Sequence, residues 1–262
     1  MGSLSLSQSL FFLLVFFLGS NLCNASLPEF SIAEDVTLEQ ADQKLQESFM
    51  DALILARVTA TTFSACDASF LRYFRALEAT FVQDVFETIA NFPLDHQIDE
   101  ETVIEILSSA SVASELQPKF AKLEIAIGNH PALPEEKNLC GTQSEGGTVF
   151  AFTYLDPSAL GDVALISLCE ETFQYPSLQE IENPPDHVRD AEGRPLPGYT
   201  CDGLGDHDTD WMSSPGGVLL HELLHWIYLL EDIPNYHDLI EMNEMGDHQI
   251  GDFDGPNPSD GS

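Results

Sequence analysis

Two histidines and a glutamate stand at a spacing that suits a zinc ion. His221 and His225 are four residues apart in the run HELLH, so on a helix both side chains lie on one face. Imidazole groups in that position reach one ion at about 2.0–2.1 Å. Glu222 lies about 100° around the helix from His221, where it can take a proton from an activated water and pass it to a leaving amine. The motif therefore predicts zinc-dependent hydrolysis, with His221 and His225 as metal ligands and Glu222 as general base.

The helix that carries this motif is expected over residues 218–230, VLLHELLHWIYLL. Ser214 suits the N-cap and Pro215 the first helical position. The run is apolar on nearly every face, which indicates a buried helix. An ordinary core helix is the alternative interpretation. Burying a glutamate and two histidines without partners costs several kcal/mol or forces them neutral, and a bound metal removes that objection.

A catalytic zinc ion needs a third protein ligand and one open position. The residue six positions after His225 is Glu231, so the pattern HExxHxxGxxH is absent. Residues of the right type lie further along the chain, and the spacing selects none of them. The candidates are Asp232, His237, Asp238, Glu241, Glu244, His248, Asp252 and Asp254.

The rest of the chain predicts an α+β fold. Apolar residues at spacings of three and four predict helices over 38–63, 66–92 and 102–116. Alternating or continuous apolar runs predict strands over 121–127, 148–154 and 163–168. Residues 176–209 are rich in Pro, Gly and Asp and are expected to be irregular. The strand at 148–154 is a candidate edge strand for pairing with an extended peptide, although a core strand explains it equally well.

The N-terminus predicts secretion. An apolar run over residues 10–19, followed by Cys23-Asn24-Ala25, is typical of a signal peptide cleaved after residue 25. Residues 26–262 then form a single domain with four cysteines, an even number that suggests two disulfides outside the cell. Of the three possible pairings we favour the following: Cys66–Cys140 and Cys169–Cys201.

The charge limits the partners. The chain holds 44 acidic and 9 basic residues, a net charge of −35, which repels nucleic acids and anionic membranes. We expect a secreted, extracellular monomer that acts on proteins or peptides. An acidic loop precedes the motif helix and suits either calcium or plain solvation. Its residues are Asp202, Asp206, Asp208 and Asp210.

Four segments resemble a known group of enzymes. Residues 166–170, 198–206, 219–226 and 250–258 look like fungal secreted peptidases similar to the aspzincins, the deuterolysin-like zinc endopeptidases. The resemblance implies a zincin-like fold, with a helical N-terminal part, a small sheet and a central HExxH helix. It also implies zinc held by His221 and His225, with Glu222 as general base. In that family an aspartate downstream of HExxH is the third ligand, and Asp252 in Ile-Gly-Asp-Phe is its best match.

The chain departs from the family pattern in two places. The aspzincin spacing GTxDxxYG is not reproduced around Asp252. The family also continues into Tyr-Gly-Pro, whose tyrosine helps polarise the substrate carbonyl, whereas this sequence stops at Ser262. Tyr228 and Tyr236 are the candidate replacements. A truncated C-terminus predicts an alternative function, a zinc-scavenging protein or inactive pseudopeptidase. Such scavenging proteins carry HRxxH, so Glu222 favours the enzyme.

Overall fold

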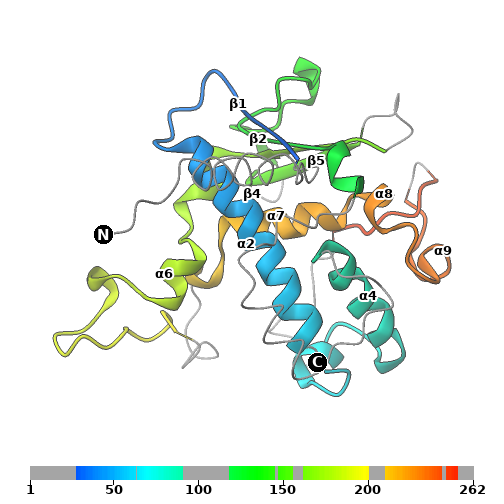
Figure 1. The fold of residues 1–262 in the computed structure, drawn as a ribbon. Helices are drawn as coiled ribbons and strands as arrows, with labels where there is room; N and C mark the ends of the chain where they lie inside the picture. Colours follow the sequence, from blue (N-terminus) through cyan, green and yellow to red (C-terminus); the bar gives the residue numbers. More distant parts are fainter. Residues whose placement is uncertain are drawn as a thin grey trace, which may run out of the picture.

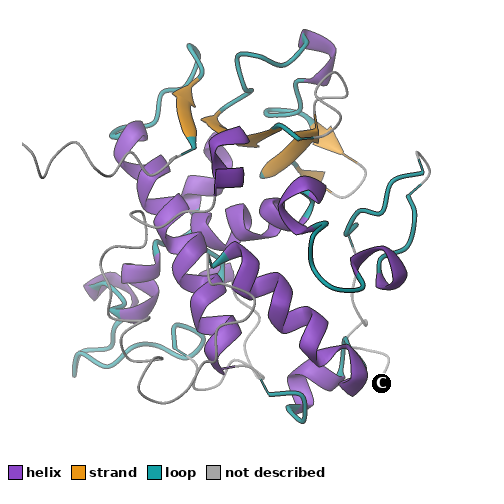
Figure 2. Ribbon diagram, turned by 45° about the vertical axis from the view of Figure 1, so that its right-hand side comes forward, coloured by secondary structure: helices purple, strands orange, loops and turns teal. Residues whose placement is uncertain are grey.

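A four-stranded sheet forms one layer of the protein, and the long helices pack against it (Figure 1, Figure 2). The computed structural model describes seven stretches of the chain. They are residues 28–62, 64–90, 118–144, 147–155, 162–200, 210–243 and 246–252. Within these residues helices and strands are mixed along the chain.

The sheet has the order β1-β2-β6-β5. Three strands run parallel: β1 (Glu29–Ile32), β2 (Leu123–Ile127) and β6 (Ala164–Leu168). The fourth, β5 (Ala151–Leu155), lies antiparallel to β6 and forms an edge. All of β6 and most of β2 are buried and almost wholly apolar, as expected of parallel strands covered on both faces.

Helices α2 (Ala41–Thr62) and α7 (Pro215–Leu224) cross beneath the sheet (Figure 1). Their backbones approach so closely that a Cβ atom on Gly216 would lie 2.4 Å from the Cβ of Asp51. Only glycine permits that contact. The fully buried side chain of Trp226, just after α7, joins the same core. The helix that carries the motif is therefore held tightly between α2 and the sheet.

The remaining elements are short, apart from α4. They are α3 (Ala68–Leu71), η1 (Ala76–Glu78), α4 (Ala79–Ile89), η3 (Pro118–Lys122), η4 (Glu135–Lys137), β3 (Gln143–Ser144), β4 (Gly147–Thr148), η6 (Glu170–Gln174), α6 (Leu178–Glu182), η7 (Asp186–Val188), η8 (Asp210–Met212), α8 (Ile227–Leu230) and α9 (Tyr236–Leu239). β3 and β4 pair antiparallel.

Most predicted elements are present, with two errors among the helices. The helix predicted over 66–92 is three separate elements, because the Glu78 carboxylate accepts the Arg75 backbone N–H at 2.8 Å and starts a new turn there. The motif helix ends at Leu224, not at residue 230, and Trp226 is extended with ψ 93°. Trp226 Nε1 donates to the carbonyl oxygen of Asp162 at 3.2 Å. That tertiary contact favours the break.

The other elements follow the sequence closely. Ser214 is the N-cap and accepts the Gly217 N–H at 3.0 Å, with Pro215 at the first position, so this prediction is confirmed. Helix α2 matches the prediction over 38–63, and β2, β5 and β6 match the predicted strands. Strand β1 was not predicted. The helix expected over 102–116 and the signal peptide over 1–25 lie outside the described residues.

The predicted disulfide pairing is wrong. Cys140 bonds to Cys169, with 5.2 Å between their Cα atoms, and Cys66 is free and exposed. The reason is the order of the sheet. Cys169 directly follows β6, and Cys140 lies in the loop after the neighbouring parallel strand β2, so the two meet at one edge. Cys201 lies outside the described residues. No helix among the described residues is long and apolar enough to cross a membrane.

Two acidic side chains make stability depend on pH. Burial raises the pKa of Glu87 from 4.5 to about 7, helped by Asp84, and burial raises the pKa of Asp51 to about 6. At pH values between the unfolded-state and the folded-state pKa of each carboxyl group, the folded chain binds more protons than the unfolded chain. The free energy of unfolding therefore falls as pH rises through this range. His130, whose pKa burial lowers, acts in the opposite direction.

We therefore expect the metal-free protein to be more stable at pH 5.5 than at pH 7.5. Glu87, which is 5% exposed, contributes on the order of 1–2 kcal/mol of this difference. Urea unfolding at both pH values measures it, in EDTA because metal binding has its own pH dependence. Glu87→Gln should flatten the profile and the exposed control Glu39→Gln should not. If the free energy of unfolding changed equally with pH in the two variants, Glu87 would not be the source of the pH dependence.

Candidate metal centre

Helix α7 presents the two motif histidines to the same point. The Nε2 atoms of His221 and His225 lie 3.2 Å apart, and their ring centroids are 4.8 Å apart at an interplanar angle of 86°. His225 is the C-cap of α7 and keeps near-helical dihedral angles, so the four-residue spacing is preserved. The local sequence alone accounts for this pair, because both residues belong to one helical segment.

A segment remote in sequence brings a carboxylate to the two histidines. Asp252 Oδ1 lies 2.9 Å from His221 Nε2 and 3.4 Å from His225 Nε2. The side chain of Asp252 is 79% exposed and that of His221 is 53% exposed, so the three groups meet at the surface. Asp252, suggested as a ligand by family resemblance alone, is therefore beside the motif histidines.

The three atoms have the spacing of ligands around zinc. Bond lengths of 2.0–2.1 Å in a tetrahedral site place ligand atoms roughly 3.3–3.4 Å apart. The separations here are 2.9, 3.2 and 3.4 Å. Two imidazoles and one carboxylate also match the donor set of a catalytic zinc site, in which a fourth position stays open. His221, His225 and Asp252 therefore fit a zinc ion.

Contacts around His225 fix the geometry of this group. Its Nδ1 lies 2.7 Å from the carbonyl oxygen of Ile250. A carbonyl only accepts, so Nδ1 carries the hydrogen and Nε2 keeps a lone pair for a metal. Gln249 Nε2 donates to the carbonyl oxygen of His225 at 2.9 Å. These two contacts hold residues 249–252 against the end of α7 and so position Asp252.

Glu222 lies beside the group and is buried, with 5% of its surface exposed. Suitable atoms of His221, Glu222 and His225 all lie within 4.8 Å of one another. The hydroxyl of Thr153, on β5, is 2.8 Å from Glu222 Oε2 and 3.0 Å from the Glu222 carbonyl oxygen. Burial raises the pKa of Glu222, while the Thr153 hydrogen bond and the two histidines lower it.

Thr153 is the residue that sequence reasoning missed. It lies in the predicted strand over 148–154, but nothing in the sequence links that strand to a helix about 70 positions later. Its bond to Glu222 leaves Oε1 as the second carboxylate oxygen for other partners. The orientation of Glu222 thus depends on how β5 packs against α7.

Several other candidates for the third ligand lie in different surroundings. Asp232 Oδ2 pairs with Lys119 Nζ at 2.7 Å. His248 Nδ1 lies 2.6 Å from the carbonyl oxygen of Ile240, and the rings of His248 and His237 pack against each other at 5.1 Å. Asp238 and Glu241 are exposed on or after α9. Glu244 and Asp254 lie outside the described residues.

Both candidate tyrosines make other contacts. Tyr236 is only 1% exposed and its ring packs against Phe81 with centroids 6.3 Å apart, so a substrate cannot reach it. The ring of Tyr228 lies under two ammonium groups, with Lys119 Nζ at 4.8 Å and Lys122 Nζ at 5.0 Å from its centroid. The side chains of the proposed calcium loop, residues 202–210, are not among those described.

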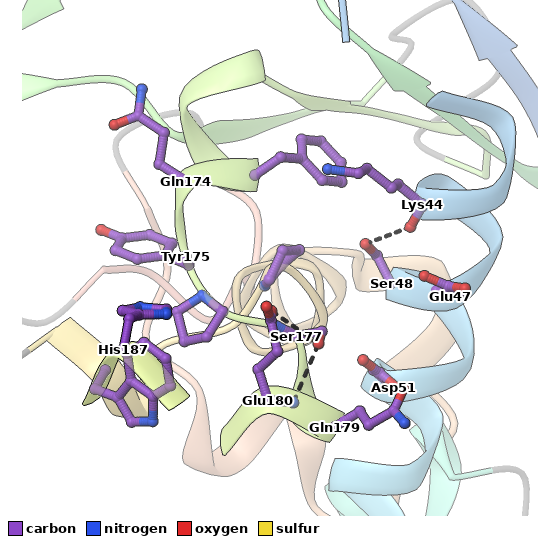
Figure 3. A pocket seen from close by; sticks show the side chains of 14 residues that line it. Lys44, Glu47, Ser48, Asp51, Gln174, Tyr175, Ser177, Gln179, Glu180 and His187 are labelled. Atoms are coloured by element: carbon purple, nitrogen blue, oxygen red, sulfur yellow. Dashed lines mark hydrogen bonds between the residues drawn. The ribbon is translucent and has the colours of Figure 1, made fainter. Parts of the chain in front are cut away.

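A separate cavity of about 590 Å³ opens at the N-terminal end of α7 (Figure 3). Lys44, Glu47 and Asp51 line it from α2, and Tyr175 and His187 lie across from them. No motif residue lines this cavity. It is therefore distinct from the metal group, which consists of His221, His225 and Asp252.

Comparisons with known proteins leave the function to be inferred from this geometry. No protein-family model, no curated protein and no solved structure matches the chain.

Proposed function

We propose that this protein is a secreted zinc endopeptidase with a zincin-like arrangement of sheet and motif helix. The observation that supports it most is the meeting of His221, His225 and Asp252 at ligand spacing, with Glu222 buried alongside. A core helix with incidental histidines does not explain why a carboxylate from residue 252 reaches the same point. Zinc bound there supplies Lewis acidity, which promotes ionisation of water and stabilises negative charge on a carbonyl oxygen.

The protein's own groups move the proton. Thr153 holds Oε2 of Glu222, which leaves Oε1 to accept a proton from the attacking water. The same oxygen then donates that proton to the amine nitrogen that leaves when the peptide bond breaks. Burial raises the pKa of Glu222, and a raised pKa suits a group that must both accept and return a proton near neutral pH.

The position of β5 supports a peptide as substrate. β5 is an edge strand of the sheet in the described residues, and Thr153 connects it directly to Glu222. An extended peptide that adds to such an edge gains backbone hydrogen bonds. Pairing with β5 would bring the backbone of the peptide past the carboxylate of Glu222.

A second candidate is a secreted protein that binds zinc without turnover. The observation in its favour is that Tyr236 is buried and that the ring of Tyr228 packs against Lys119, so neither is free to serve as an oxyanion donor. A lost oxyanion donor lowers the rate by about 10²–10³. Retention of Glu222 instead favours the enzyme, since proton transfer requires such a carboxylate, whereas His221, His225 and Asp252 already form a zinc ligand set.

Zinc analysis and casein hydrolysis on the secreted protein distinguish the two. We expect one zinc per chain, loss of hydrolysis after dialysis against EDTA, and recovery on adding one equivalent of zinc. One zinc without hydrolysis under any condition would support the zinc-binding alternative. Full hydrolysis by protein shown to be metal-free would contradict both.

A further inference from the structure

A cavity of about 620 Å³ opens directly beside His221 and Glu222. Its walls come from four separate parts of the chain: α2, the segment leading into β5, the start of α6, and the segment that leads into and forms α7. Most of the side chains that line it are apolar. They include Leu55, Val149, Phe150, Met212 and Val218.

The lining offers no counter-charge away from the metal group. Among the described residues that line the cavity, His221 and Glu222 are the only ionisable ones, and both are engaged in the proposed chemistry. A lysine or arginine side chain entering this space would lose hydration without gaining an ion pair. An acidic side chain would meet a strongly negative protein, with net charge −35. The chemistry of the walls therefore favours an apolar group.

Gly217 keeps part of this space open. A Cβ atom there would lie 3.4 Å from Ser214 Oγ and 3.9 Å from Leu55 Cδ1, both ordinary contact distances. The fold thus has room for a side chain at this position, unlike at Gly216, where α2 is too close. Glycine is a poor helix former compared with alanine. Its effect here is to leave the cavity wider.

We propose that this cavity receives a large apolar side chain, such as leucine, phenylalanine or methionine, from the bound peptide. The residue concerned flanks the bond held at Glu222. The inference rests on the proposed peptidase function and adds the class of substrate. Ala151, the first residue of β5, also lines the cavity. A peptide paired with β5 projects alternate side chains to one face, so one of them can enter.

Equilibrium binding tests the cavity without requiring turnover. Zinc-loaded Glu222→Gln protein is titrated with five-residue glycine peptides that carry phenylalanine, alanine or lysine at the centre. We expect the phenylalanine peptide to bind roughly tenfold more tightly than the other two. Leu55→Glu in the same background should reverse the order of phenylalanine and lysine. Ile54→Glu is the matched control, because Ile54 is the neighbouring residue, 40% exposed, and does not line the cavity.

Gly217→Ala provides a second variant that leaves the fold intact. It should reduce the preference for phenylalanine over alanine roughly threefold to tenfold without lowering the melting temperature. Equal binding of the three peptides, a preference for lysine, or equal effects of Leu55→Glu and Ile54→Glu would each overturn the inference.

Cleavage of a peptide library by the wild-type protein separates this inference from the proposed function. Apolar-selective binding without any cleavage would mean that the peptidase proposal fails while the cavity assignment holds. Cleavage with no apolar preference beside the cut bond would mean the reverse.

Discussion

Glu222→Gln is expected to lower kcat/KM for peptide hydrolysis by about 10²–10⁴-fold, the usual contribution of a general base. The change removes the ability to accept a proton and keeps the shape of the side chain. The amide oxygen can still accept from Thr153, whose hydroxyl lies 2.8 Å from Glu222 Oε2. Zinc content should therefore stay at one ion per chain. Initial rates on a fluorogenic peptide, with elemental analysis of the same sample, measure both quantities.

The matched control is Glu182→Gln, which makes the same chemical change at an exposed position at the end of α6. It should retain wild-type activity. A Glu222→Gln protein with undiminished activity would rule out the proton-transfer role. Loss of zinc together with activity in that variant would show instead that Glu222 acts on metal binding.

Asp252→Ala is expected to weaken zinc binding by more than about 100-fold. Removing a residue that only hydrogen-bonds to a metal ligand costs up to about 100-fold in metal affinity, and removing a ligand itself should cost more. Two imidazoles would remain, and a surface site with two ligands holds zinc poorly. Asp252 Oδ1 is within 3.4 Å of both Nε2 atoms, whereas the neighbouring carboxylate of Glu222 is held by Thr153. Competition with a chromophoric chelator gives the affinity.

Two control variants make this test specific. Asp247→Ala changes an exposed aspartate in the same segment and should leave the affinity unchanged. Asp232→Ala removes a rival candidate that instead pairs with Lys119, and it should also have no effect on zinc. If Asp232→Ala weakened binding and Asp252→Ala did not, the ligand assignment would be wrong.

Local patterns in the sequence were sufficient for the parts of the site that lie on one helix. The four-residue spacing of His221 and His225, and the cap formed by Ser214 and Pro215, depend only on neighbours within a few turns. The same holds for α2 and for the buried strands β2 and β6, whose apolar periodicity indicates their type. Hydrogen bonds and side-chain spacing within a single segment determine such features.

Long-range packing decided the rest. The pairing of Cys140 with Cys169 follows from which strands are neighbours in the sheet. The break after α7 follows from the burial of Trp226. Thr153 meets Glu222 only because β5 lies against α7. These contacts join residues far apart in the chain, and no local periodicity records them.

Asp252 lies between these two cases. Family resemblance suggested it, but the residues alone left eight candidates of suitable chemistry. The tertiary structure places it next to the histidines through the contacts of Gln249 and Ile250 with His225. The sequence by itself predicted two zinc ligands and a base, because one helix carries all three. The position of Asp252, the orientation of Glu222 and the cavity beside it depend on segments that only folding brings together.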